Sequence, residues 1–405
     1  MEKKNLLIVL DPVSHGVSAQ LEILKPIVIC LAQKFNLTIY SSIISDSVKE
    51  DLKRLGAHVA TPTRKFSVTG RVLNILKSHN ESMLWLSAWV AQSLFLRNSH
   101  FLSRTVRLDD YDVKINMTNP TFMPCDIWWN QGYPLYHTLD LSIRNYRFPL
   151  RLAFFFLRPF MKMFDWKMLN RQRDNSKSVA FNSRSLANFY SEFDFPPGDV
   201  IYPAKDLNNF VPSKTPPTRD YVLTYLGKET EINTLKKIAQ RGIPMVSFGG
   251  KLPKGMKMAS SSPGVVNLGY VSDEKLVQLF QNALFTAFPF TNEQFGLIPL
   301  ESMACGTPVL TYDRGGPSET VLDNETGWLV SDENEFVKKA SELWVSKSVS
   351  HIDIEKCRLR ALQYDQNMVG MKLLNLIERA LMEKNPQPEA ADPTPPAVAV
   401  VPYSE

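Results

Sequence analysis

The sequence has few cysteines and no apolar run long enough to cross a membrane. Four of its 405 residues are cysteine, widely spaced and without a Cys-x-x-Cys pair: Cys30, Cys125, Cys305 and Cys357. Such thiols argue against a disulfide framework or a structural zinc site and fit a reducing cytosol. No window of about 18 residues is free of charge, so no transmembrane helix is expected. The apolar run at residues 6–10 is too short for a signal-peptide core.

Net charge is also small. Lys and Arg total 46 and Asp and Glu total 41, which leaves +5 over the whole chain. An excess of this size does not by itself predict a nucleic-acid-binding protein. The hydrophobic content of 44% is enough for a large core, and the length is that of two or three domains.

The basicity is concentrated in one stretch, residues 143–174, which holds eight basic and two acidic residues among many Phe and Trp. Bulky apolar residues interleaved with cations suit the surface of an anionic membrane. The alternative is a pair of core helices that covers the N-terminal sheet. Single-stranded nucleic acid can stack on aromatics, but this run is too apolar for a solvated groove, so no nucleic-acid partner is expected.

Apolar residues elsewhere follow a strand–helix–strand pattern, first over residues 6–42. This pattern predicts a parallel sheet with helices on its faces. After a proline-rich linker at 200–220, a second α/β series begins near residue 221. Two such domains predict a cleft whose walls are the loops after the strands.

The most informative segment is 289–329. Glu293 and Glu301 lie eight positions apart, and Phe295-Gly296-Leu297 stands where a helix would begin. A helix N-terminus with a glycine offers bare N–H groups and a positive dipole end to a diphosphate or to sugar hydroxyls. A carboxylate at position 301 can accept hydrogen bonds from vicinal hydroxyls such as those of ribose. Two glutamates on a helix are more often solvated side chains. The prediction of a ligand site therefore depends on the whole segment 289–329 and not on the two glutamates alone.

The rest of the string adds a probable helix cap at Gly306 and a tight turn at Gly315-Gly316, where backbone could approach a ligand. In this order the string resembles the nucleotide-sugar site of family-four glycosyltransferases, in which Phe-Gly follows the first of two glutamates separated by seven residues. The further matching positions are Ala304-Cys305-Gly306-Thr307-Pro308-Val309, Gly315-Gly316, Glu319 and Gly327. The resemblance extends more weakly over most of residues 1–384.

The resemblance implies the GT-B fold, an α/β architecture of two Rossmann-like domains facing each other across a cleft, with a C-terminal helix that crosses back to the N-terminal domain. We expect an N-terminal acceptor-binding domain at 1–200, with a membrane-facing segment near 143–174, and a nucleotide-sugar-binding domain at 201–358. A crossover helix is expected at 359–384, and the proline-rich tail at 385–405 is expected to be disordered.

By the same resemblance, Glu293 contacts hydroxyls of the donor sugar, and the backbone at Phe295, Gly296 and Leu297 faces the sugar and diphosphate. Glu301 binds the ribose. The family usually has an Arg where this chain has Lys228, which keeps the charge but loses the bidentate fork. Lys251 is the candidate second cation for the diphosphate, and ordinary surface lysines are the alternative at both positions.

The N-terminal half departs further from the family. Where the family has a glycine-rich loop after its first strand, this chain has a single glycine, Gly16. Gly16 would let the backbone approach the donor phosphate or the acceptor, and His15 is a candidate neighbour of the same group. A plain turn is the alternative. Many relatives carry a His after a middle strand, where this chain has Asn130 and Gln131. These amides are possible acceptor or sugar contacts, but they provide no proton chemistry.

The implied activity is retaining transfer of a hexosyl unit from a UDP- or GDP-linked sugar to an acceptor hydroxyl, with no metal and no cofactor beyond the donor substrate. If residues 143–174 meet a membrane, a lipid-linked saccharide in glycan assembly, at the cytoplasmic face, is the expected acceptor. The alternatives are a soluble transferase acting on a free sugar or small metabolite and a non-catalytic nucleotide-sugar-binding scaffold.

Overall fold

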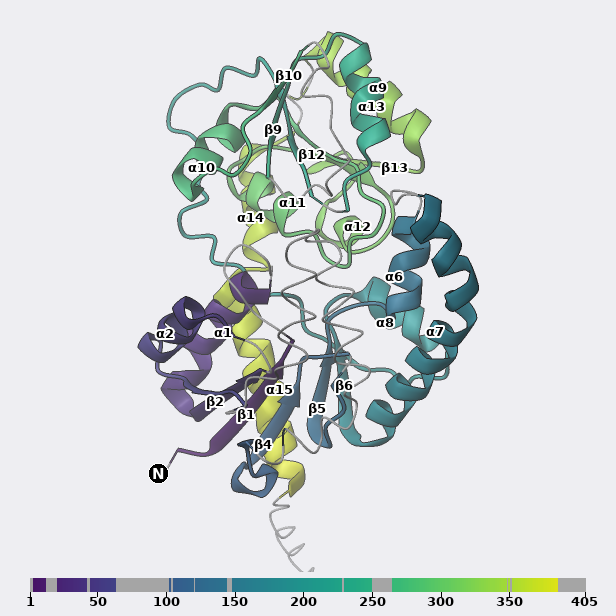
Figure 1. Cartoon of the computed structure of the whole chain (residues 1–405). Coiled ribbons are helices and arrows are strands. Elements are labelled where there is room, and N and C mark those ends of the chain that lie inside the picture. The colour runs from purple at the N-terminus through teal and green to yellow at the C-terminus, as the bar shows by residue number, and fades with distance from the viewer. Residues whose placement is uncertain are drawn as a thin grey trace, which may run out of the picture.

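The computed structural model describes two parallel sheets with helices packed on their faces (Figure 1). The expected α/β architecture of two Rossmann-like halves is confirmed. The described residues are 3–11, 20–41, 44–62, 102, 105–119, 121–143, 148–227, 229–249, 264–347, 349 and 352–384. The tail at 385–405 lies outside them.

The first sheet has the strand order β3-β2-β1-β4-β5-β6-β7. Its strands are β1 (Asn5–Leu10), β2 (Asn36–Ser41), β3 (His58–Ala60), β4 (Val113–Asn116), β5 (Cys125–Asn130), β6 (Ser176–Phe181) and β7 (Asp199–Val200). The central strands β1 and β5 are buried along almost their whole length. Burial on both faces explains why β1 is a continuous apolar run rather than an alternating one.

The second sheet repeats the same doubly wound order, β10-β9-β8-β11-β12-β13. Its strands are β8 (Val222–Tyr225), β9 (Met245–Phe248), β10 (Val265–Asn267), β11 (Thr286–Phe288), β12 (Val309–Tyr312) and β13 (Gly327–Val330). These strands pair in parallel throughout. In both sheets the strand order reverses beside the first strand, which is where such folds bind ligands.

Helices cover both sheets. In the N-terminal half they are α1 (Gln20–Lys34), α2 (Asp46–Arg54), α6 (Leu135–Ser142), α7 (Phe148–Asp174) and α8 (Arg184–Ser191), with a short 3-10 turn at Leu108–Asp110. In the C-terminal half they are α9 (Ile232–Gln240), α10 (Asp273–Asn282), α11 (Leu297–Ala304), α12 (Pro317–Thr320), α13 (Glu333–Ser346), α14 (Ile354–Leu362) and α15 (Gln366–Lys384).

The stretch expected as one crossover helix, 359–384, covers the end of α14 and all of α15, with a break between them. α14 packs on α11, whereas α15 packs on α1, β4 and β5 of the first sheet (Figure 1). Gly370 allows α15 and α1 to come close, because an added Cβ would lie 2.9 Å from Cys30 Sγ. The chain therefore crosses between the halves at residues 363–365, and the expected return of the C-terminal helix to the N-terminal half is confirmed.

Residues 148–174 form one long helix, α7, rather than a pair. Its inner side buries Phe154 and Leu169, and the buried Gln172 exchanges two hydrogen bonds with the backbone of Met123. Within the described part of the chain, neither α7 nor any other helix is long and apolar enough to cross a bilayer.

Candidate functional site

The loops after β8 and β11 lie together at the point where the second sheet reverses its order. Thr291 N donates a hydrogen bond to Glu229 O at 2.7 Å, and Glu231 N donates to Pro289 O at 3.1 Å. Ligands of doubly wound sheets bind outside the carboxyl ends of strands at such a reversal. The Glu293 segment therefore starts where this class of fold builds its ligand site.

Glu293 folds back on the turn that begins α11. Its Oε1 accepts hydrogen bonds from the N–H groups of Phe295 at 3.3 Å and Gly296 at 3.1 Å. Gly296 precedes the helix with φ of 91°, a left-handed conformation that favours glycine. In this structure the neighbouring carboxylate accepts both N–H groups, and their contact with the donor stays a prediction.

Phe295 and Leu297 place the start of α11 between the two halves. Phe295 is buried, and its ring centroid lies 5.5 Å from that of Tyr202 and 5.6 Å from that of Tyr364. Leu297 packs against the apolar clusters of both sheets. Their side chains therefore fix the loop, and only their backbone is available for a role at the donor.

Gly315 and Gly316 pack against the Glu293 loop instead of facing open space. A Cβ on Gly315 would lie 2.5 Å from Glu293 O, and a Cβ on Gly316 would lie 2.1 Å from Phe295 Cα. Gly316 N also donates to Glu293 O at 3.0 Å. We expected this turn to approach a ligand; the structure shows that it packs against the loop that contains Glu293.

Glu301 lies in α11 and forms a buried ion pair that the sequence did not reveal. Its Oε1 is 2.8 Å from Lys205 Nζ, and the two side chains are 7% and 9% exposed. Lys205 belongs to the stretch between the two sheets, after β7 and before β8, and is distant in sequence from the acid pair. The one available signal was a lysine in an otherwise apolar run, Ile201 to Ala204, which predicts nothing specific about a partner.

The acid pair shares one side of the second sheet with a third carboxylate. Burial raises the pKa of the Tyr225 phenol, and the negative charges of Glu229, Glu293 and Glu301 raise it further. Tyr225 is the last residue of β8. Because all three carboxylates are near enough to raise the pKa of its phenol, they lie around the carboxyl end of that strand. The structure thus brings Glu293 and Glu301 together at the expected edge.

Two glycines accommodate the Tyr225 ring at the ends of β8 and β9. An added Cβ on Gly227 would lie 2.3 Å from the ring, and one on Gly249, where φ is 95°, would lie 2.8 Å from it. Tyr225 pairs with Phe248 in the sheet, so the loops after both strands leave from neighbouring points. The candidate lysines Lys228 and Lys251 lie outside the described residues, as do Gly16 and His15.

Asn130 and Gln131 end β5 and begin the loop behind it. Asn130 is fully buried, and its Oδ1 accepts a hydrogen bond from Gly132 N at 3.0 Å. The Asn130 side chain thus shapes its own turn through Oδ1, and its contact with an acceptor or sugar stays a prediction. Gln131 is partly exposed, and its backbone carbonyl accepts a hydrogen bond from Asn182 Nδ2 at 2.9 Å.

Glu319, known from the sequence only as a matching position, joins the two halves of the molecule. Its carboxylate accepts hydrogen bonds from the N–H groups of Arg184 at 2.9 Å and Ser185 at 2.7 Å. The hydroxyl of Tyr202 donates to the same carboxylate at 2.9 Å. Sequence periodicity cannot detect such a contact, because the partners are 134 residues apart.

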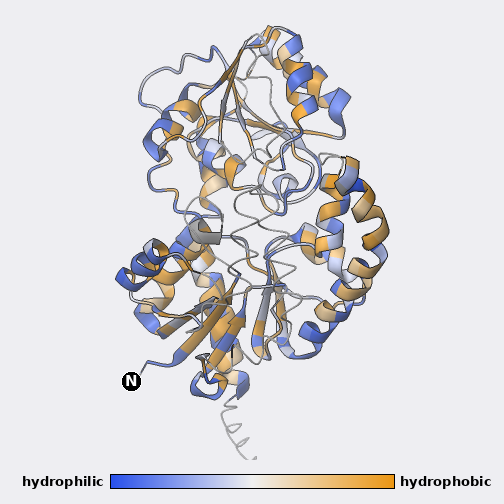
Figure 2. Cartoon of the chain, in the orientation of Figure 1, coloured by the Kyte–Doolittle hydropathy of each residue, from blue (hydrophilic) through white to orange (hydrophobic). Residues whose placement is uncertain are grey.

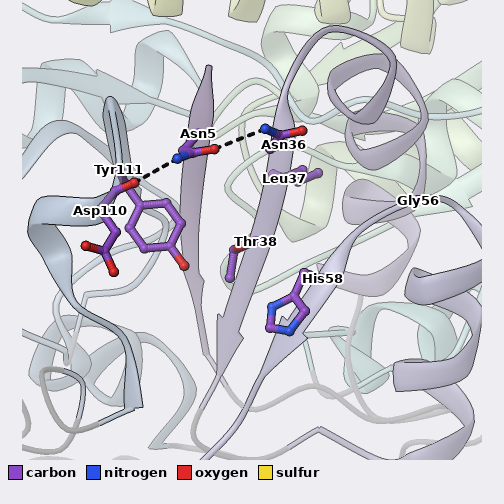
Figure 3. Close-up of a pocket in the computed structure, with 8 residues that line it drawn as sticks. All are labelled: Asn5, Asn36, Leu37, Thr38, Gly56, His58, Asp110 and Tyr111. Atoms are coloured by element: carbon purple, nitrogen blue, oxygen red, sulfur yellow. Dashed lines mark hydrogen bonds between the residues drawn. The ribbon is translucent and has the colours of Figure 1, made fainter. Parts of the chain in front are cut away.

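A shallow pocket of about 360 Å³ lies at the opposite edge of the first sheet, where β1 and β2 begin (Figure 3). Its two asparagine side chains already have partners: Asn36 Nδ2 donates to Asn5 Oδ1, and Asn5 Nδ2 donates to the backbone carbonyl of Asp110. This pocket has no connection with the acid pair. Over the described ranges, no group of three His, Cys, Asp or Glu could hold a metal ion.

The fold and the site define a class of protein: a GT-B architecture with its acid pair at the switch point of the second sheet. Residues 220–352 match the family model described as Glycosyl transferases group 1. The match contains every element of the site from β8 to α12. This segment, about a third of the chain, is thus similar to group 1 glycosyl transferases.

Two curated proteins match parts of the chain. The alpha-1,3/1,6-mannosyltransferase alg-2 of Neurospora crassa is 49% identical over 51 residues, 13% of this chain and 11% of that protein. The D-inositol 3-phosphate glycosyltransferase of Mycobacteroides abscessus is 28% identical over 155 residues, 33% of this chain and 35% of that protein. The chain therefore spans only about a tenth to a third of the lengths of these relatives.

A solved structure shares the whole architecture. Anabaena HepE, in complex with UDP and glucose, superposes with a TM-score of 0.62 over 93% of this chain and 99% of its own. The sequence identity is 14%, so this likeness establishes the fold alone.

Proposed function

We propose that the protein is a retaining glycosyltransferase that moves a hexosyl unit from a UDP- or GDP-linked sugar to an acceptor hydroxyl. The observation that carries the proposal is the position of Glu293 and Glu301, at the strand-order reversal and within the segment that matches group 1 glycosyl transferases. The relatives' names support sugar transfer, and the UDP and glucose bound to HepE support a nucleotide-sugar donor for this fold.

In the proposed reaction, the bond between the sugar and the diphosphate breaks and negative charge builds up on the leaving diphosphate. Lys228 and Lys251 would stabilise that charge electrostatically. Glu293 would accept hydrogen bonds from the sugar hydroxyls and orient the ring. Front-face attack by the acceptor hydroxyl, whose proton passes to the donor phosphate, would retain the anomeric configuration without a protein base.

We further propose that the acceptor is lipid-linked and that α7 rests on the membrane that holds it. Figure 2 shows long apolar stretches on α7, at the outer edge of the molecule. Seven large side chains between residues 148 and 163 are between 47% and 71% exposed: Phe148, Leu152, Phe155, Phe156, Leu157, Phe160 and Met163. Most of them recur at intervals of three or four residues, which places them on the outer side of the helix.

The composition of this face favours a lipid surface over water. Monomeric proteins seldom expose so many large apolar side chains side by side without a partner. Arg151 and Lys162 are also exposed and lie along the border of the face, which suits anionic headgroups. This face favours the lipid-directed enzyme over a soluble transferase that acts on a small metabolite.

The test is a panel of UDP- and GDP-linked hexoses incubated with the protein, with release of free UDP or GDP as the readout. We expect one donor to release nucleotide faster when membrane lipid extract supplies acceptors. Binding of a donor without release under any condition would support the scaffold alternative instead.

A further inference from the structure

Lys205 and Glu301 form an ion pair in a place nearly closed to water. Their side chains are 9% and 7% exposed, and Nζ lies 2.8 Å from Oε1. The ammonium group also lies over the ring of Phe210, 5.3 Å from its centroid. Burial of two charges carries a large desolvation cost, so a pair of this kind is weak evidence for stability alone and invites a functional explanation.

The backbone of Lys205 marks the crossing between the two halves. Lys205 forms a parallel bridge with Asp365, and Gln366 N donates to Lys205 O at 3.0 Å. The outgoing segment after β7 and the returning segment before α15 therefore run side by side at this residue. From that point the Lys205 side chain reaches into α11 of the second half.

The helix that carries Glu301 is itself firmly held. α11 is buried from Pro299 to Ala304, and Arg358 Nη1 donates to Ala304 O at 3.0 Å and to Phe210 O at 2.7 Å. Because the backbone is fixed in this way, the orientation of the Glu301 carboxylate depends on its own side-chain contacts. Among the described residues, Lys205 supplies a charged contact to that carboxylate.

We infer that Lys205 is a positioning residue, which keeps the Glu301 carboxylate ionised and turned toward the ribose hydroxyls of the donor. The inference rests on the proposed function and on the ribose contact that the family resemblance implies for Glu301. A hydroxyl donates more strongly to a carboxylate than to a neutral acid or an amide, because a charged acceptor makes the stronger bond. The pair also links recognition of the ribose to the segments that join the two halves.

The test measures ribose discrimination. UDP and GDP are titrated calorimetrically into the wild-type protein, and the tighter ligand is compared with its 2′,3′-dideoxy analogue. A hydrogen bond to a charged group contributes about 1.5–3 kcal/mol, so the analogue should bind at least about tenfold more weakly. In Lys205→Met we expect the ratio to fall to about threefold or less, whereas Lys205→Arg, which keeps the charge, should stay within about threefold of wild type.

The matched control is Lys237→Met, which removes an exposed ion pair with Glu333, 2.6 Å long, from the same half of the protein. Its ribose discrimination should equal that of wild type. Lys205→Gln keeps a hydrogen-bond donor toward Glu301 and replaces Lys205→Met if the latter does not fold, as judged by its thermal transition. A folded Met or Gln variant with the wild-type ratio overturns the inference.

Two further outcomes separate this inference from the function on which it rests. If the wild-type protein binds neither UDP nor GDP, the proposed donor is wrong and the inference fails with it. If the wild-type protein binds one of them but does not discriminate against the dideoxy analogue, the proposed function stands and the role of Lys205 is overturned.

Discussion

Glu319 of the second half caps a helix of the first: its Oε1 accepts a hydrogen bond from Ser185 N at 2.7 Å, in the first turn of α8. At the N-cap of α8, Ser183 accepts a hydrogen bond from the N–H group of Leu186. The first N–H groups of this helix therefore donate partly to Ser183 of the first half and partly to Glu319 of the second half. The contact fixes how the two halves meet beside the cleft.

Glu319→Ala should loosen this contact. Removal of a helix cap costs about 0.5–2 kcal/mol, and here the loss falls on the junction between the halves. We expect a lower thermal midpoint and a larger radius of gyration by small-angle X-ray scattering. Glu342→Ala, which removes an exposed carboxylate paired with Lys338 within α13, is the control and should change neither. Identical scattering curves for Glu319→Ala and wild type would contradict the assignment.

Asp165 of α7 should make stability depend on pH. Its Oδ2 accepts a hydrogen bond from Tyr136 N at 2.8 Å, and burial raises the pKa of the carboxyl from 3.8 to about 7. Between these values the native state keeps a proton that the unfolded state has lost. This contribution to the free energy of unfolding is therefore full below about pH 4 and is lost as the pH rises through 7.

Asp165→Asn should remove that dependence, because an amide oxygen still accepts from Tyr136 N and carries no charge. Relative to this variant, the wild-type protein should lose up to about 2–3 kcal/mol between pH 5 and pH 8, measured by urea unfolding. Asp174→Asn, at an exposed position of the same helix, is the control. Parallel pH curves for wild type and Asp165→Asn would be inconsistent with the raised pKa.

The exposed face of α7 should bind vesicles of anionic phospholipid. Phe155→Asp combined with Phe160→Asp should weaken binding at least about tenfold in a sedimentation assay, since each large apolar side chain contributes about 1.5–3 kcal/mol on burial. Val345→Asp changes a residue of α13 that is 83% exposed and should leave binding unchanged.

Salt and lipid charge separate the two parts of this prediction. Wild-type binding should weaken with added salt and on neutral vesicles, because Arg151 and Lys162 border the face. If the wild-type protein stays in solution with anionic vesicles at low salt, the proposal that α7 rests on a membrane is wrong.

The sequence predicted those features that depend on local pattern. Apolar runs identified the buried strands, and the fixed order of Glu293, Phe295, Gly296 and Glu301 identified the segment at the switch point. Contacts between distant residues could not be read in the same way. Lys205 meets Glu301, and Glu319 meets Ser185, only because the chain crosses twice between the halves.

Local pattern also misled in places where packing decides the outcome. Gly315-Gly316 has the composition of a ligand-binding turn, yet its lack of side chains serves the Glu293 loop. The stretch at 143–174 predicts either a membrane-facing segment or a pair of core helices, and the structure shows one long helix, α7, packed on α6 and β6 with an exposed outer face.

The most direct test of the account is hexosyl transfer from the identified nucleotide sugar by wild type, Glu293→Ala and Glu301→Gln. Glutamine is preferred at 301 because Glu301→Ala would leave the buried Lys205 unpaired, at a cost of about 3–5 kcal/mol. We predict that both variants fold and lose at least about a hundredfold in kcat/KM, while the control Glu333→Ala stays within about twofold of wild type. Transfer at the wild-type rate by both site variants would contradict the account.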